Sequence, residues 1–586
     1  MPPKKRKSVS KANAFFSNAR LSLFIKQCII FFESDIALAF AAGLIALLSY
    51  NAYFGIQLME FDALPKVLFH QGQSPAEIIK IFSMPDGPSL YSINYRPFSS
   101  VLWWIAFSIA GLGFSALHAL NFALHALNAA LVFLLARNLI RSKTGFFELL
   151  ASLAFALHPV HLNTVLFVSR MPELLLAFFM LSSLLCLILF LKGSGRHFFM
   201  LSIALCFLAM LSKEPGILVP FILFFYVLSF SRARGFAQRI KASLKFSLSF
   251  FLLAPAYLAL MFFALGRLGG YLLAPQRFGS QTIYSLFLFL FYPVNFLSTI
   301  FFNSFYRLFQ NPVLDALFLS LFAAASFLCI WFFSRKQESS ALFLMLFLLA
   351  FPTAFVCAGL FQVWYTYLPS IPFSILAALF LRKHFHSFSK STASQVAVAL
   401  VSLLLFSLIL FSPLFVFYKH PLEAASMAKS VLEQSVVAAE DAPENSTLYL
   451  VNFPQHLLYP ENGLRVVMLM LNETAVQSFL DFRLPEKNLK AVSLTSLMVL
   501  SPDINEKQFD LIQGGKCSFT LQNSGRASAR VQLPFAWQSL SRETGISLQL
   551  ERSDEIESIQ ISLPPEACSN AAFLLFDGRK VQFIRV

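Results

Sequence analysis

ALHPVHLNTVLFVSRMPELLLAFF, residues 156–179, places two histidines, an arginine and a glutamate between two stretches that are each apolar enough to enter a bilayer. Ionisable side chains beside lipid are expensive because hydrocarbon does not solvate charge. His158, His161, Arg170 and Glu173 therefore need a role, either in a polar turn at the membrane surface or in a functional site.

The composition is that of a polytopic membrane protein. Of 586 residues, 57% are hydrophobic and 13% are charged, whereas a soluble domain has about a quarter of its residues charged. The formal net charge of +15 does not indicate nucleic acid, because the basic residues fall in short clusters between apolar segments. We predict a basic cytoplasmic N-terminus (1–35), a transmembrane domain (36–418) and an extracytoplasmic soluble domain (419–586).

A membrane-spanning helix needs about 20 mostly apolar residues. We predict eleven spans, at residues 36–58, 115–136, 147–163, 172–191, 197–212, 215–231, 246–265, 313–334, 341–361, 364–381 and 394–417. Every connection from an even-numbered span to the next odd-numbered span carries basic residues, such as Arg137 and Arg141. Positive charge favours the cytoplasmic side, so the N-terminus is predicted to be cytoplasmic and the C-terminal domain periplasmic, in a bacterial inner membrane.

Two further apolar segments are not counted as spans. Residues 97–111 are too short to cross, and we predict an interfacial helix with Trp103 and Trp104 at the headgroup level. Residues 284–305 are long enough to cross, but a crossing would reverse the later basic connections, so we interpret them as a re-entrant or surface segment.

The remaining charged residues gather on the predicted outer side. Glu60, Asp62 and Arg96 lie in the outer loop 59–114, and Lys213 and Glu214 lie in the turn between the fifth and sixth spans. Carboxylates and cations at one bilayer face indicate a site for phosphate-linked sugar chemistry. A carboxylate can take the proton of an attacking hydroxyl, and a cation can stabilise the departing phosphate.

Several motifs resemble one known family. Residues 95–140 (beginning YRPFSSVLWW), 155–179, LAMLSKEPGILVPFILFFY (208–226) and YTYLPSIPF (365–373) resemble the membrane half of the TPR-containing O-mannosyltransferases, of the GT-C superfamily. The resemblance covers about residues 36–380 and does not extend to TPR repeats. It implies a GT-C-like helical membrane fold and transfer of a sugar from a polyprenyl-phosphate donor.

The resemblance also implies roles for particular residues. An acidic residue in the first outer loop corresponds to Asp62 as catalytic base, with Glu60 as the second choice. Family motifs match Arg170 and Glu173, and Lys213 and Glu214, as residues for substrate or phosphate binding. Arg96 is a further candidate from its own position, either for phosphate binding or for a scaffold role. No metal ligands are assigned, although a divalent metal remains possible as a cofactor.

We expect the histidines of the transmembrane domain to form structural hydrogen bonds. We expect HPVH to form a hydrogen-bonded polar turn in preference to a metal site, because Pro159 interrupts the helix that would align both rings. His118 and His125 are expected to hydrogen-bond to Asn121 and Asn128 within the bundle.

The C-terminal domain carries an expected helix at 421–438 followed by short strand-like runs, typical of an α/β or mostly β domain. Cys517 and Cys568 are its only cysteines, and their pairing is left open.

We therefore expect an inverting glycosyltransferase that acts on an envelope glycan, lipid or protein acceptor. A transporter or flippase of a lipid-linked glycan is the first alternative, although its charges should lie near mid-bilayer. A non-catalytic assembly subunit is the second, because Ala63 stands where a second acid would follow Asp62.

Overall fold

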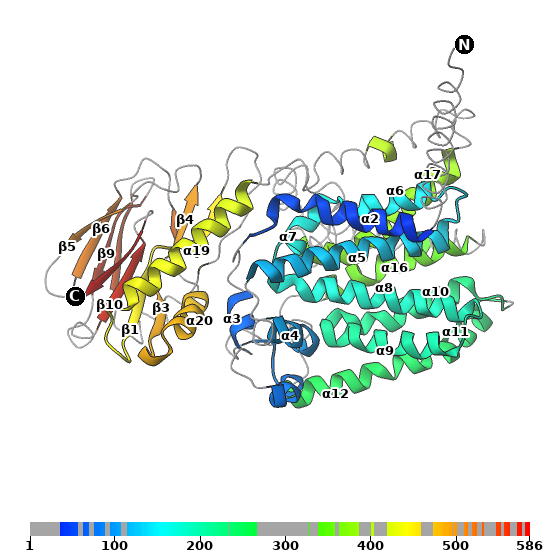
Figure 1. The fold of residues 1–586 in the computed structure, drawn as a ribbon, viewed down its shortest axis with the longest axis horizontal. Helices are drawn as coiled ribbons and strands as arrows, with labels where there is room; N and C mark the ends of the chain where they lie inside the picture. Colours follow the sequence, from blue (N-terminus) through cyan, green and yellow to red (C-terminus); the bar gives the residue numbers. More distant parts are fainter. Residues whose placement is uncertain are drawn as a thin grey trace, which may run out of the picture.

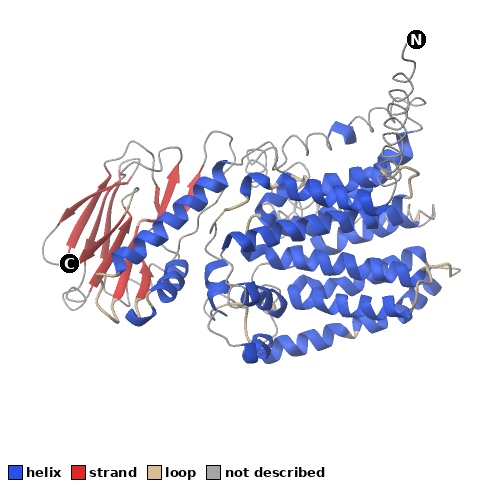
Figure 2. Ribbon diagram, viewed as in Figure 1, coloured by secondary structure: helices blue, strands red, loops and turns tan. Residues whose placement is uncertain are grey.

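The computed structural model shows a bundle of helices beside a smaller part made of strands and two helices (Figure 2). It describes residues 35–56, 63–69, 75–87, 94–106, 114–233, 235–266, 327–328, 338–357, 363–385, 400–403, 419–458, 471, 473–494, 496–500, 509–513, 518–523, 530–532, 547–552, 556–562, 571–576 and 580–585. The predicted re-entrant or surface segment 284–305, most of the predicted spans 313–334 and 394–417, and both Cys517 and Cys568 lie outside these residues.

The bundle is built from helices that follow the apolar runs of the sequence. They are α2 (Asp35–Ser49), α3 (Ala63–Phe69), α4 (Pro97–Trp104), α5 (Phe114–Ile140), α6 (Phe146–Ala156), α7 (Leu162–Val165), α8 (Met171–Leu191), α9 (Arg196–Ser212), α10 (Val219–Phe230), α11 (Phe236–Phe251), α12 (Leu253–Leu265), α16 (Ser339–Cys357) and α17 (Tyr367–Phe385). Short 3-10 segments join them: η1 (Asn51–Tyr53), η2 (Pro75–Ser83), η4 (Pro159–His161), η5 (Val168–Arg170), η6 (Glu214–Leu218) and η10 (Val363–Thr366).

Four helical stretches of the described chain are long and apolar enough to cross a membrane: Phe114–Ile140, Val168–Leu191, Ala237–Leu265 and Trp364–His384. Each overlaps a predicted span. Shorter apolar helices, such as Arg196–Ser212 and Glu214–Phe230, fall within other predicted spans. The chain is thus a helical membrane protein by the length and composition of these helices.

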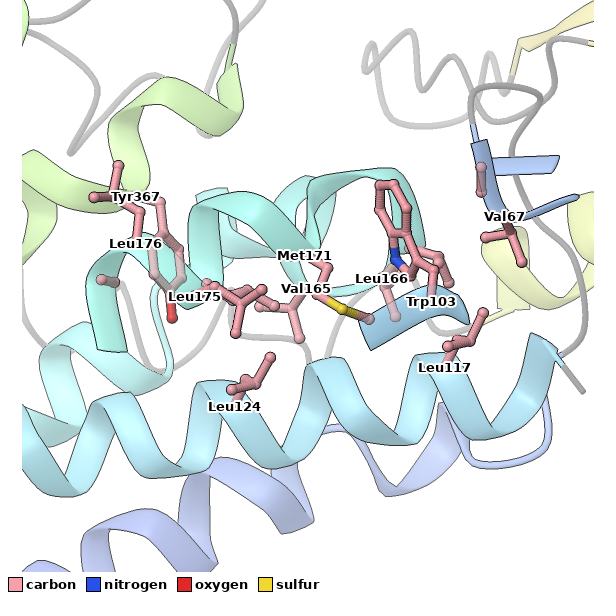
Figure 3. Packing of buried hydrophobic residues seen from close by; sticks show 14 of the residues in the cluster. Val67, Trp103, Leu117, Leu124, Val165, Leu166, Met171, Leu175, Leu176 and Tyr367 are labelled. Atoms are coloured by element: carbon pink, nitrogen blue, oxygen red, sulfur yellow. The ribbon is translucent and has the colours of Figure 1, made fainter. Parts of the chain in front are cut away.

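Trp103 and Trp104 face the protein interior, whereas the rings of an interfacial helix would face the headgroups; the depth of this helix in the membrane stays a prediction. The expected helix is present as α4, but both indole side chains are buried, with exposures of 0% and 1%. Figure 3 shows Trp103 in the same apolar cluster as Leu117 of α5, Leu166 at the end of α7 and Met171 at the start of α8. Burying a ring as large as that of Trp inside the protein removes more apolar surface from water than an interfacial position does.

The outer loop between α2 and α5 is packed onto the helix ends. Helix α4 contacts the end of α9, η2 contacts α12, and the rings of Tyr95 and Tyr257 lie 6.0 Å apart. In Figure 1, α3, α4 and α7 lie at the end of the bundle nearest the strands, and α10 and α11 meet at the opposite end. The loop therefore covers one end of the bundle.

A separate group of ion pairs joins α2, α5 and α6 at the end of the bundle opposite the outer loop. The Arg137 guanidinium donates from Nε to Asp35 Oδ1 at 2.6 Å and from Nη1 to Glu148 Oε1 at 3.4 Å. Glu148 also accepts from the Ser142 backbone N–H at 2.6 Å. Glu148, an unusual carboxylate on the predicted cytoplasmic side, thus fixes the turn between α5 and α6.

The described C-terminal part combines mixed and antiparallel sheets. Its elements are α19 (Lys419–Ala439), β1 (Thr447–Val451), β2 (Phe453–Leu458), α20 (Glu473–Arg483), η12 (Pro485–Lys487), β3 (Lys490–Ser493), β4 (Ser496–Leu500), β5 (Phe509–Gln513), β6 (Ser518–Asn523), β7 (Arg530–Gln532), β8 (Ser547–Arg552), β9 (Ile556–Ser562), β10 (Ala571–Phe576) and β11 (Val581–Arg585). One sheet has the order β11-β10-β1-β3, with β1 parallel to both neighbours; an antiparallel sheet has the order β5-β6-β9-β8, and a third has β2-β4-β7.

Helices α19 and α20 connect this part to the bundle. Helix α19 packs on β10 and β11, and α20 packs on β3 and α19 (Figure 1). Helix α20 also packs against α3 of the outer loop. The strand-bearing part therefore lies at the same end of the bundle as the outer loop.

Candidate functional site

A buried ion pair joins the outer loop to the turn between α9 and α10. The Arg96 guanidinium makes a two-pronged contact with the Glu214 carboxylate, from Nε to Oε1 at 3.0 Å and from Nη2 to Oε2 at 3.0 Å. Both side chains are less than 10% exposed. A two-pronged arginine–carboxylate contact fixes the orientation of both groups as well as their distance.

Asp86 extends this pair across the outer loop. Arg96 donates from Nη1 to Asp86 Oδ2 at 3.5 Å, and the Lys66 ammonium lies 4.0 Å from the same oxygen. The Asp86 side chain is fully buried, and its backbone N–H donates to the Asn94 carbonyl at 3.1 Å. The loop is thus held by a chain of alternating charges that begins on α3 and ends on η6.

A second buried pair lies beside the first. The Lys213 ammonium donates to Glu173 Oε1, and both side chains are at most 5% exposed. The other carboxylate oxygen, Glu173 Oε2, is buried and has no hydrogen-bond partner among the described residues. Since a buried carboxylate oxygen without a partner is costly, Oε2 has capacity for a group that the described chain does not supply.

Two aromatic rings of η10 lie against Lys213 of this second pair and against Arg170. Arg170 Cζ lies 3.7 Å from the centre of the Trp364 ring, and Lys213 Nζ lies 5.1 Å from that of Tyr365. A cation over an aromatic face gains electrostatic attraction, more so when water is excluded. Tyr365 also interacts electrostatically with Arg96 and Glu173, so both ion pairs form one cluster.

We call Lys66, Asp86, Arg96, Arg170, Glu173, Lys213 and Glu214 the polar cluster. Four of its side chains are cationic and three are acidic, so it carries one formal positive charge. A buried group of charges with a cationic excess is complementary to an anion.

Proline positions two members of the polar cluster. Pro97 follows Arg96 at the first turn of α4, and Pro172 precedes Glu173 in the first turn of α8. Proline suits a first helical turn because its fixed backbone angle matches the helix and its missing N–H is not needed there. Glu173 is stabilised there by the positive end of the helix dipole.

A glycine sets the turn that carries Lys213 and Glu214. Lys213 is extended, with φ −161° and ψ 148°, and it separates α9 from η6. A Cβ added to Gly216 would lie 2.4 Å from the Ala209 carbonyl oxygen and 2.6 Å from Met210 Cα. Only glycine permits this close approach, which directs the two charged side chains to different partners.

Burial and pairing change the protonation equilibria of the cluster. Burial lowers the pKa of the Lys213 ammonium to about 8, against the opposing attraction of Glu173. Burial alone would raise the pKa of the Glu214 carboxyl, but the Arg96 guanidinium outweighs it and holds that pKa below its usual range. Burial thus makes the Lys213 ammonium easier to deprotonate, while pairing with Arg96 favours the ionised form of Glu214.

The structure brings together five residues that the sequence analysis selected, namely Arg96, Arg170, Glu173, Lys213 and Glu214. Asp62 and Glu60 lie outside the described residues, and the chain resumes at Ala63 with α3. Sequence reasoning missed Lys66 and Asp86. Asp86 precedes a glycine in MPDGPS (84–89), a typical turn signal that does not reveal burial.

His125 takes other partners than expected. It contacts the Tyr367 hydroxyl at 2.8 Å and the Ala156 carbonyl at 3.0 Å, and Asn128 donates to the Leu174 carbonyl at 3.0 Å. The predicted hydrogen bond between His125 and Asn128 was wrong, because both side chains bind groups of neighbouring segments; the pairing of His118 with Asn121 stays a prediction.

HPVH is a hydrogen-bonded turn. His158 Nδ1 accepts from the Val160 backbone N–H at 3.2 Å, and His161 Nε2 contacts Ser370 Oγ at 2.9 Å. Within the described part of the chain, no group of three or more His, Cys, Asp or Glu residues is placed to hold a metal ion.

No protein-family model and no curated protein matches the chain. It is similar to the solved structure of ArnT from Cupriavidus metallidurans bound to undecaprenyl phosphate, with a TM-score of 0.44 and 12% identity over 91% of this chain and 98% of that one. It is also similar to the archaeal oligosaccharyltransferase AglB from Archaeoglobus fulgidus in complex with an inhibitory peptide and a dolichol-phosphate, with a TM-score of 0.42 and 12% identity over 89% and 79% of the two chains. At these scores the likenesses carry no argument about function.

Replacing Glu214 by Gln should destabilise the protein, because the buried Arg96 guanidinium would lose its charged partner. Loss of one member of a buried pair costs about 3–5 kcal/mol. We expect a clear fall in the midpoint of thermal unfolding in detergent. Glu444→Gln changes an exposed carboxylate and should leave the midpoint nearly unchanged. Equal midpoints for both variants would contradict a stabilising role for the Arg96–Glu214 pair.

Proposed function

We propose that this chain is an inverting membrane glycosyltransferase that moves a sugar from a polyprenyl phosphate to an acceptor on the extracytoplasmic side. The observation that carries the proposal is the polar cluster, which gathers a cationic excess at one end of an apolar bundle. A lipid-linked donor needs its phosphate bound at the level where the bilayer meets water, because the polyprenyl chain remains in hydrocarbon.

Lys213 and Arg170 are suited to the donor phosphate. Each lies over an aromatic ring of η10, Lys213 over Tyr365 and Arg170 over Trp364, and the rings of these two residues are 5.9 Å apart. A phosphate oxygen gains charge as its bond to the sugar breaks, and cations already in position stabilise that charge without rearrangement. Arg96 is held by two carboxylates and orients the cluster, whereas Lys213 has one carboxylate partner.

The reaction requires one base. The acceptor hydroxyl attacks the anomeric carbon, its proton passes to a carboxylate, and the sugar–phosphate bond breaks with its electron pair leaving on the phosphate. Attack opposite the leaving phosphate inverts the anomeric carbon. We assign the base to Asp62, with Glu60 as the second choice, on the family resemblance. Glu173 Oε2, which has no partner among the described residues, is suited to accept a hydrogen bond from a sugar hydroxyl.

The distribution of charge favours an enzyme over a transporter. The ion pairs found among the described bundle residues belong to the outer loop and helix starts at one end, or to the turns at the other. Between them, polar side chains such as His125 and Tyr367 are hydrogen-bonded to each other. A transporter for a charged glycan would need charged groups along its path.

Replacing Asp62 by Asn should lower kcat by about 10²–10⁴-fold, because the acceptor hydroxyl would lose its proton acceptor. The assay supplies a panel of polyprenyl-phosphate sugars to the protein in nanodiscs and measures sugar release or transfer. Glu444→Gln is the control and should keep full turnover. Equal turnover in Asp62→Asn would remove Asp62 from the mechanism, and a wild-type protein that neither hydrolyses nor transfers any donor would favour the assembly-subunit alternative.

Donor affinity should fall as the pH rises through about 8. The Lys213 ammonium, whose pKa is lowered to about 8 by burial, is charged below that pH and loses its proton above it. Binding of a polyprenyl phosphate, measured by fluorescence or calorimetry between pH 6.5 and 9.5, checks the expectation. Lys213→Arg keeps its charge over the whole range and should flatten the profile. A wild-type profile that is already flat would contradict binding of the phosphate by Lys213.

A further inference from the structure

A groove lined by both apolar and polar side chains lies between α9 and α11, away from the end of the bundle that holds the polar cluster. Its volume is about 650 Å³, and its walls include Phe199 of α9 and Phe246, Leu248 and Leu252 from α11 and the start of α12. Leu248 and Leu252 are 56% and 62% exposed. The volume lies in the range of small-molecule sites, and the walls are those of a site for an acyl chain.

The polar groups of the groove follow one stripe of α11. Lys241, Lys245 and Ser249 are spaced by four residues, so they lie on one face of the helix, each about 6 Å further along its axis. Lys245 and Ser249 line the groove, and both lysines are exposed. Neither lysine forms an ion pair with a carboxylate of the described chain. The stripe runs from two cations, through a hydroxyl, into apolar surface.

The Ser249 hydroxyl distinguishes this stripe from an ordinary basic helix end. Serine within a helix commonly donates to the carbonyl four residues earlier, as Ser212 does to the Leu208 carbonyl at 2.7 Å. Ser249 Oγ is shielded from solvent and has no hydrogen-bond partner in the described chain. Ser243 and Ser247 share this property but do not line the groove.

We propose that this groove binds one anionic glycerophospholipid from the leaflet at the α10–α11 end of the bundle. The phosphate lies between Lys241 and Lys245, an ester carbonyl accepts from the Ser249 hydroxyl after that side chain turns toward the groove, and an acyl chain follows Leu248 and Leu252. The order along the stripe matches the order of groups in such a lipid, whose esters lie deeper than its phosphate. A polyprenyl phosphate has no acyl ester carbonyl and leaves Ser249 without a partner.

This site is independent of the proposed transferase activity. Its lysines are on α11, whose first turns carry three basic residues, and Arg239 of that group is already engaged by the Ala233 carbonyl at 3.1 Å. The two remaining ammonium groups are available to a headgroup, and each adds to the attraction for an anionic lipid. The lipid would cover part of the stretch Ala237–Leu265, formed by α11 and α12. This stretch is the least buried of the four long apolar helical stretches of the described chain.

Native mass spectrometry of the full chain with added lipids tests the proposal. Phosphatidylglycerol should bind at least tenfold more tightly than phosphatidylcholine, which has the same esters but no net charge. The double variant Lys241→Gln, Lys245→Gln should lose this preference, at roughly fivefold per lysine. Lys143→Gln removes an exposed cation of the α5–α6 turn at the same end and should keep the preference.

The ester contact is tested separately. Ser249→Ala should weaken binding of diester phosphatidylglycerol by about fivefold and leave binding of the diether form, which has no carbonyl, unchanged. All these substitutions are at exposed or groove-lining positions, and unchanged midpoints of thermal unfolding without lipid verify the fold. Equal binding of the two headgroups, a lysine double variant that behaves as wild type, or a Ser249→Ala effect of the same size on the diether lipid would overturn the proposal. Tighter binding of a polyprenyl phosphate than of phosphatidylglycerol would do so as well.

Discussion

The cost of burying charge is the constraint on which this structure depends. The Arg96 guanidinium is 6% exposed, and a charge at that depth persists only with a close and well-oriented partner. Glu214 provides that partner from a turn 118 residues away in the chain. The contact therefore ties the outer loop to the end of the helical bundle.

With the outer loop held in this position, the other charged side chains of the polar cluster reach their partners. Asp86 accepts a further contact from the Arg96 guanidinium. Lys213, which is adjacent to Glu214 in the sequence, donates to Glu173 at the start of α8. The result is a set of oriented cations beside a carboxylate oxygen that has no partner in the described chain. Such an arrangement needs little reorganisation to receive a phosphate and a sugar.

Much of this follows from the sequence, because the strongest signals are local. Long apolar runs predict α5, α8 and α17, and charged residues beside such runs stand out because they are costly there. Motifs such as LSKEPG place charge next to a helix-starting proline, and this made Lys213 and Glu214 visible.

Tertiary partners were not visible in the same way. Asp86 looks like a turn residue and Lys66 like a surface lysine, since neither residue's neighbours reveal that the loop folds back onto the bundle. Tryptophan is typical of membrane interfaces, but Trp103 is buried because α4 packs against α9. Each of these depends on contacts between distant segments, which a local pattern does not specify.

The central claim is that a lipid phosphate binds at the polar cluster. A polyprenyl phosphate with a photoreactive group next to the phosphate, added to the protein in nanodiscs and followed by peptide mapping, tests it most directly. The account predicts cross-links in the segments 170–173 and 213–214. Cross-links confined to the basic turn at 232–245, at the other end of the bundle, would contradict it.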